Sequence, residues 1–170
     1  LHDVSGKVNR KWTTHAWIIC KLEFKERKRQ IMAPNSYTEL FFYDEACAMA
    51  AGHRPCGECR IDAYRRFKIL WQHAYGTVGT VKDIDRRLHA ERLDTFRIHV
   101  SELVDGVMFL SPNDGDQMPT LWWQNRAYAW TERGYKDVKL PLETDRFELL
   151  TAPSLVEMIR RGYVPQVRLD

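Results

Sequence analysis

Two cysteines separated by two residues constrain this chain more than any other feature. Cys56 and Cys59 stand in the run Gly-His-Arg-Pro-Cys-Gly-Glu-Cys-Arg, residues 52–60. A tight turn, eased by Gly57, lets both thiolates face one metal ion, and zinc favours such soft tetrahedral sites. The alternatives are thiols packed without metal and a redox pair, although a redox pair usually opens a helix in a thioredoxin-like unit. The pair therefore predicts a zinc knuckle, meaning a tight metal-binding turn.

A zinc knuckle needs two further ligands. Cys20 lies on a predicted strand upstream and is the expected third ligand, with a small buried hydrophobic residue as its alternative reading. We take His53 as the candidate for the fourth position, and His2, His15 and His89 remain open alternatives. Cys47 lies among alanines on a short predicted helix, where burial is its expected role.

The segments before the cysteine pair predict a small antiparallel sheet. Residues 16–24 and 37–43 are rich in β-branched and aromatic side chains, which is typical of strands. Asp44 is expected to cap a short helix over residues 45–51, and Gly52 is expected to end it, because glycine adopts the left-handed conformation common at helix ends.

Two longer helices are predicted after the pair. Apolar residues recur at three- and four-residue spacing over residues 61–74, which marks one face of an amphipathic helix that ends at Gly76. Asp83 is expected to cap a further helix that runs through Leu93, with Ile84 and Leu88 facing inward.

Beyond residue 94 the pattern changes to short extended runs. Strands are predicted at residues 96–100, 107–110, 120–124, 127–131 and 147–150, with a polar loop at 111–119 and a last helix, capped by Ser154, at 155–161. The turn at Asn125-Arg126 predicts a hairpin with Trp122, Trp123 and Trp130 close in space. The sequence therefore predicts an α+β fold: residues 1–94 form the zinc-binding region with its sheet and central helices, and residues 95–170 form a β-rich subdomain packed on it.

Composition allows a folded domain but does not identify a partner. The 170 residues are 44% hydrophobic, enough for a sizeable core. The net charge of +3 is too small to indicate nucleic-acid binding unaided, but basic clusters at residues 25–29, at 65–68 and at 86–87 can form one basic face. The chain shows no apolar run near the ~20 residues of a membrane span, no signal segment and no secreted disulfide pattern. We expect a cytoplasmic protein in a reducing compartment.

A denser signature surrounds the cysteine pair. It consists of Phe41-Phe42-Tyr43, an alanine-rich helix, Ala50-Ala51-Gly52, and then Arg-Pro-Cys-x-x-Cys. Across residues 37–60 this resembles the N-terminal zinc-binding domain of the Ada DNA-repair proteins, including stand-alone bacterial proteins with an Ada-like centre. The likeness does not cover the C-terminal half.

The resemblance implies a cysteine-bound zinc ion and a metal-bound thiolate that accepts a methyl group from a methylated DNA phosphate. By position, Cys20 would be the acceptor. The chain departs from the family pattern because no second cysteine lies near Cys20. It also lacks a recognisable helix-turn-helix and the Pro-Cys-His-Arg motif of the alkyltransferase domain.

These features predict a zinc-binding, nucleic-acid-binding protein with DNA as the expected partner and a link to DNA repair or processing. Arg54 and Arg60 are the expected phosphate contacts, because arginine binds phosphate oxygens in a bidentate manner; packing on Tyr43 or pairing with Glu58 is the alternative for Arg54. The aromatic residues Trp122, Trp123, Tyr128, Trp130 and Tyr135 either stack on unpaired bases or form the core of the β-rich part.

Two other functional classes remain open. One is an enzyme, which would be either a methyl acceptor that uses Cys20 or a metal-dependent nuclease that uses histidines. The other is a zinc-stabilised protein-interaction module that does not bind nucleic acid.

Overall fold

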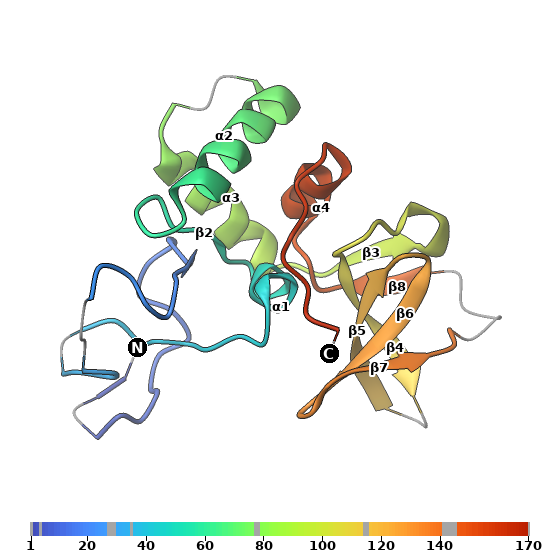
Figure 1. Cartoon of the computed structure of the whole chain (residues 1–170), viewed down its shortest axis with the longest axis horizontal. Helices are drawn as coiled ribbons and strands as arrows, with labels where there is room; N and C mark the ends of the chain where they lie inside the picture. Colours follow the sequence, from blue (N-terminus) through green and yellow to red (C-terminus); the bar gives the residue numbers. More distant parts are fainter. Residues whose placement is uncertain are drawn as a thin grey trace.

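The computed structural model describes residues 2–3, 5–26, 30–34, 36–76, 79–113, 116–140 and 146–169. These contain both helices and strands, so the predicted α+β class is confirmed (Figure 1). In chain order the elements are β1 Ile18–Ile19, α1 Glu45–Ala50, β2 Arg54–Pro55, α2 Ile61–Tyr75, α3 Val81–Arg92, β3 Phe96–His99, the 3-10 turn η1 Val100–Glu102, β4 Met108–Asn113, β5 Asp116–Trp123, β6 Arg126–Thr131, β7 Gly134–Val138, β8 Arg146–Leu149 and α4 Pro153–Arg160.

A six-stranded antiparallel sheet forms most of the C-terminal half, in the order β3-β8-β4-β5-β6-β7. The five predicted strands all lie in it, with shifted ends, and β7 is an addition. The polar loop predicted at residues 111–119 is wrong, because β4 and β5 stay paired as far as Asn113 and Asp116. This pairing satisfies backbone groups that a loop would leave to solvent.

The hairpin between β5 and β6 is confirmed, with its turn one residue earlier than predicted. Gln124 and Asn125 both have positive φ angles, 50° and 59°, as a two-residue hairpin turn requires. Trp122 packs against the main core and Trp123 against a smaller cluster, because successive strand residues point to opposite faces. Trp122 and Trp123 therefore face opposite sides of the sheet, and the closeness in space of Trp122, Trp123 and Trp130 stays a prediction.

The predicted N-terminal antiparallel sheet is also wrong. β1 pairs with β2 in parallel, and Ile18 lies opposite Arg54. Residues 37–42 form no strand. In this segment Phe42 packs against the core, but Tyr37 and Phe41 are exposed, so burial gives little support to a strand there.

The helices begin with different residues from those predicted in two of four cases. The Asp44 cap of α1 is confirmed by its bond from the Cys47 N–H. Thr80, rather than Asp83, precedes α3, and the Asp83 carboxylate accepts the Thr80 N–H at 2.7 Å. Ala152, rather than Ser154, precedes α4. Ser154 does not act as the cap because its N–H and its hydroxyl both donate to the carboxylate of Glu91 on α3.

The larger hydrophobic core of the described residues lies between the helices and the sheet. Phe67 of α2 and Leu88 of α3 meet Phe109 and Phe147 of the sheet, and α4 adds Leu155. Each of these side chains is at most 2% exposed. The core crosses the boundary predicted between residues 94 and 95, and the division into two parts remains a prediction.

The chain after α4 returns to α1 (Figure 1). The buried Glu45 carboxylate accepts the Tyr163 hydroxyl at 2.8 Å and the Gln166 N–H at 2.9 Å. The neighbouring Asp44 carboxylate accepts the Arg168 N–H at 3.2 Å. These bonds fix α1, and α1 leads directly into the cysteine loop.

Candidate metal centre

The parallel pairing of β1 with β2 brings the upstream cysteine to the cysteine pair. The Arg54 N–H donates to the Trp17 carbonyl and the Cys56 N–H to the Ile19 carbonyl, both at 3.1 Å. Cys20 follows directly after β1 and therefore lies beside the loop that begins at Cys56. A turn closed by the Arg60 N–H on the Cys56 carbonyl, at 3.2 Å, then leads into α2.

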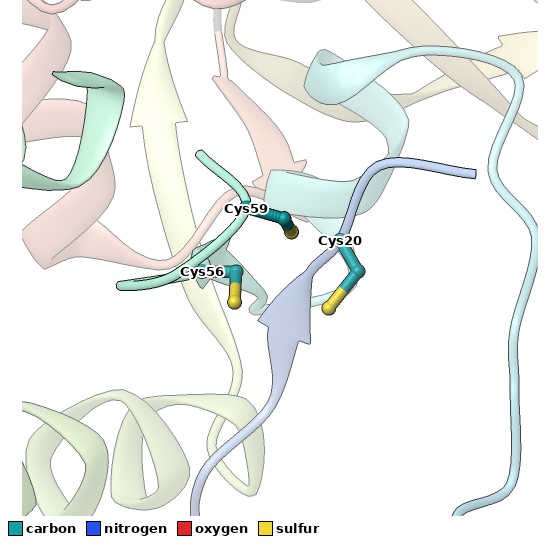
Figure 2. A group of neighbouring side chains, drawn as sticks. All are labelled: Cys20, Cys56 and Cys59. Atoms are coloured by element: carbon teal, nitrogen blue, oxygen red, sulfur yellow. The ribbon is translucent and has the colours of Figure 1, made fainter. Parts of the chain in front are cut away.

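Three sulfur atoms meet at this point. The Sγ atoms of Cys20, Cys56 and Cys59 all lie within 4.8 Å of one another. Figure 2 shows the three side chains converging from the end of β1 and from the loop before α2. Cys56 and Cys59 are only 9% and 8% exposed, whereas Cys20 is an exposed residue. The group can hold a metal ion.

Backbone amides support two of the sulfurs. The Lys21 N–H donates to Cys59 Sγ at 3.2 Å, and the Glu58 N–H donates to Cys56 Sγ at 3.4 Å. Donors aimed at a sulfur favour its thiolate form, which is the form that binds metals. One donor, Glu58, lies in the cysteine turn itself, and the other, Lys21, lies in the segment that follows β1.

The pKa values of two thiols reflect this crowding. Burial of the sulfur, followed by repulsion from Cys56 and Cys59, raises the pKa of Cys20 to about 12. Burial also raises the pKa of Cys56, but backbone bonds from Cys59 and Glu58 outweigh it and lower the pKa overall. A bound metal ion displaces the thiol protons, and its positive charge offsets the repulsion between the neighbouring thiolates.

The predicted fourth ligand, His53, does not join the group. Its ring is 6% exposed, with Nδ1 3.1 Å from the Ala51 carbonyl oxygen. It packs against the rings of Trp17 and Phe42, at centroid distances of 5.1 and 4.7 Å. Burial lowers the pKa of His53 to about 4, so it is neutral at physiological pH. His53 is an aromatic packing residue in this geometry.

The other candidate ligands also have different contacts. His2 lies 2.7 Å from Thr38 Oγ1. His15 and His89 stack on each other at a centroid distance of 4.2 Å. Cys47 Sγ lies 3.2 Å from the Tyr135 hydroxyl, and burial raises the pKa of Cys47 to about 11. Within the described residues, the three cysteines are therefore the group that comes together.

Arg54 is not placed to contact a phosphate. It is 6% exposed, and its Nε and Nη2 donate to the two carboxylate oxygens of Asp85 on α3, at 2.6 and 2.8 Å. The guanidinium also lies over the Tyr64 ring, 5.7 Å from its centroid. The expected phosphate contact is thus replaced by a buried ion pair that fixes the cysteine loop against α3.

Arg60, the second predicted phosphate contact, is only partly accessible. Its side chain is 21% exposed, and Nη1 lies 3.6 Å from Glu45 Oε1. Its Nε is buried and has no hydrogen-bond partner among the described residues. Phosphate binding by Arg60 remains a prediction.

Two residues that position the site were not predicted. Asp85 holds Arg54, and Arg92 donates to the carbonyls of Gly52 and His15 at 2.9 and 3.0 Å. The Arg92 guanidinium also lies over the Trp17 ring at 4.0 Å. A signal for Asp85 was present, because it follows Ile84 and precedes Leu88 by three positions, which places a carboxylate on the buried face of α3.

Neither the predicted aromatic group nor the predicted basic clusters form one site. Trp122, Trp123, Tyr128 and Tyr135 pack against core clusters, as the core interpretation expects, and Trp130 is 37% exposed. Of the basic cluster at residues 25–29, residues 27–29 lie outside the described residues. Several arginines and lysines of the other two clusters lie over aromatic rings: Arg66, Lys68 and Arg87.

No helix in the described part of the chain combines the length and the apolar character needed to cross a membrane.

No protein-family model matches the sequence, and the searches of curated proteins and of solved structures also find no match. The resemblance of residues 37–60 to the Ada zinc-binding domain therefore stays a prediction from the sequence.

Proposed function

We propose that the protein binds one zinc ion through Cys20, Cys56 and Cys59, and that the surface around this ion binds nucleic acid, DNA in particular. The convergence of three sulfurs from two distant segments carries the proposal. Thiolates are soft ligands that select zinc over magnesium or calcium, and the two N–H···S bonds suit a zinc knuckle.

The ion would have a clear structural role. Between residues 5 and 26 the only strand is the two-residue β1, so regular backbone pairing contributes little there. A metal bound to Cys20 and to the 56–59 loop joins this segment to α2. Zinc in such sites supplies folding free energy directly.

Elemental analysis of purified protein tests zinc binding. We expect one zinc per chain in the wild type and in Cys47→Ser, whose thiol lies outside the group. We expect loss of zinc in Cys56→Ser and weaker zinc binding in Cys20→Ser. Absence of zinc from wild-type protein prepared without chelator, and no uptake of added zinc, would overturn the proposal.

Charge distribution supports the nucleic-acid part of the proposal. Residues 1–30 contain 8 basic and 3 acidic residues, whereas residues 31–170 contain 18 and 20. The segment that supplies Cys20 is thus the basic part of the chain. Lys21, directly after the first cysteine, is exposed, as are Lys11 and Lys25. A basic segment that supplies a ligand of the metal favours a polyanion with regularly spaced phosphates.

Fluorescence anisotropy with labelled duplex and single-stranded DNA tests this part. Binding should weaken steeply as salt rises, because phosphate neutralisation releases counterions. Lys21→Glu should weaken binding much more than Lys136→Glu, an exposed charge reversal on β7. Equal effects of the two variants, or binding that ignores salt, would favour the protein-interaction module instead.

A second candidate function, methyl acceptance at Cys20, is favoured by one observation. Of the three sulfurs, those of Cys56 and Cys59 accept backbone N–H bonds and belong to buried residues, whereas Cys20 is exposed. In the transfer, a new S–CH₃ bond forms as the O–CH₃ bond of a methylated phosphate breaks, and a phosphodiester anion leaves. Mass spectrometry after incubation with methylated DNA should show one added methyl group on Cys20, and Cys20→Ser should show none.

A further inference from the structure

We infer that the metal centre takes its fourth ligand from outside the chain, and that this ligand is a thiol. The inference rests on the proposed zinc binding. It concerns the open side of the three-cysteine group.

The described residues supply three donors and no fourth. The three sulfurs form the group, and no histidine, aspartate, glutamate or further cysteine of the described residues joins it. The nearest candidate in sequence, His53, has its Nδ1 on the Ala51 carbonyl and its ring between two aromatic rings. Cys47 lies against the Tyr135 hydroxyl. Zinc with three protein ligands completes its tetrahedron with an exogenous ligand.

The side of the group at Cys20 is accessible. Cys20 and Lys21 are exposed, and so are Gly57 and Glu58, which join the two buried cysteines. Figure 2 shows the Cys20 side chain reaching the other two sulfurs from the end of β1. A small ligand can therefore approach the metal from this side without moving the core.

The chemistry of the donors selects a soft ligand. Three thiolates carry three negative charges and leave Zn²⁺ with little residual positive charge, so the ion polarises an oxygen ligand weakly. A fourth sulfur completes the all-sulfur environment common in zinc sites. Two basic residues directly follow cysteines of the group: Lys21 follows Cys20, and Arg60, whose buried Nε has no hydrogen-bond partner in the described part of the chain, follows Cys59. On binding, the thiol gives its proton to the buffer, a metal–sulfur bond forms and a solvent ligand leaves.

Cobalt(II)-substituted protein, prepared with a phosphine reductant instead of a thiol, provides the test. Titration with N-acetylcysteine should strengthen the sulfur-to-cobalt charge-transfer absorption until it saturates. X-ray absorption on the zinc form, which needs no variant, should show the number of bound sulfurs rising from three to four. His53→Phe and Cys47→Ser should behave like the wild type, because neither residue supplies a ligand.

The outcomes separate this inference from the proposed function. Failure to bind zinc or cobalt defeats the proposed function itself. In a monomer, metal binding with four protein ligands before any thiol is added, or with an oxygen ligand that N-acetylcysteine does not displace, overturns the thiol inference alone. Size-exclusion chromatography distinguishes the source of the thiol: a dimer that N-acetylcysteine dissociates indicates a cysteine of a second copy, and a monomer throughout indicates a small thiol.

Discussion

Residues 5–26 and the six-stranded sheet are held in place by different kinds of contact. The sheet has backbone ladders between all neighbouring strands and buries Phe109 and Phe147 in the main core. The N-terminal segment has a two-residue pairing with β2 and side-chain contacts from Arg92 to His15 and Trp17. Few backbone pairs mean a low local free energy of opening. We therefore expect a metal cross-link to matter greatly for the first region and little for the second.

Metal removal should have the largest effect and should separate the two regions. Ion binding contributes on the order of 10 kcal/mol in small zinc domains. A chelator should remove hydrogen-exchange protection from residues 5–26 and 53–60, while β4 to β6 keep theirs. Mass spectrometry of exchanged peptides measures this. Equal loss of protection in the sheet would show that the regions form one cooperative unit.

Truncation of a core side chain in the six-stranded sheet should give the next largest loss of stability. Phe109 is 0% exposed, so Phe109→Ala removes a fully buried ring and should lower the free energy of unfolding by about 3–5 kcal/mol in urea titrations. Zinc content per folded chain should not change. Trp130→Ala, at a side chain that is 37% exposed, is the control and should cost much less.

Acid should destabilise the N-terminal region through His53. Burial lowers the pKa of His53 from 6.5 to about 4, so below pH 6.5 the unfolded chain binds a proton that the folded chain does not. The free energy of unfolding should therefore fall as the pH drops from about 6.5 to about 4, by up to about 3 kcal/mol. In metal-free protein, where release of zinc at low pH makes no contribution, His53→Phe should remove this slope. At neutral pH the variant should keep its zinc. Loss of zinc from His53→Phe would instead indicate that His53 is a zinc ligand.

The smallest effect isolates the contact between Arg92 and Gly52. Gly52 has φ +75°, and a Cβ atom there would lie 2.3 Å from Arg92 Cδ. Gly162, which ends α4 with the same pattern of backbone hydrogen bonds, has φ +98° and nothing within 4 Å of a Cβ atom. Both alanine substitutions should cost about 1–2 kcal/mol for the backbone conformation, and Gly52→Ala should cost more because Arg92 must move. Equal decreases in the melting temperature of the two variants would mean that the Arg92 side chain moves aside at no cost in free energy.

Local patterns predicted the parts of the structure that depend on local contacts. The spacing of Cys56 and Cys59, the apolar face of α2 and the hairpin turn at Asn125 all involve residues within a few positions of one another. Cys20 was chosen as the third ligand because thiolates are common zinc ligands, not because a local pattern pointed to it. The contact that brings Cys20 to the pair, between β1 and β2, joins residues that lie far apart in the sequence.

The failures share a physical cause, which is competition from distant partners. β1 pairs with Arg54 and Pro55 rather than with residues 37–43, and no local feature encodes that choice. In the sequence Arg54 resembles a surface arginine. In the structure its guanidinium donates hydrogen bonds to Asp85, 31 positions later. β7 has a weak strand composition, Gly-Tyr-Lys-Asp-Val, and becomes a strand because it pairs with β6.

The bonds between the C-terminal tail and α1 also set an order for biosynthesis. Glu45 receives the Tyr163 hydroxyl across 118 positions, so a ribosome makes the partner of this carboxylate long after the carboxylate itself. Until then α1 lacks the contacts that hold its start, and the loop that follows it is less firmly anchored. The cysteines emerge early, but the nascent chain is expected to complete their surroundings only when residues 163–168 have left the ribosome.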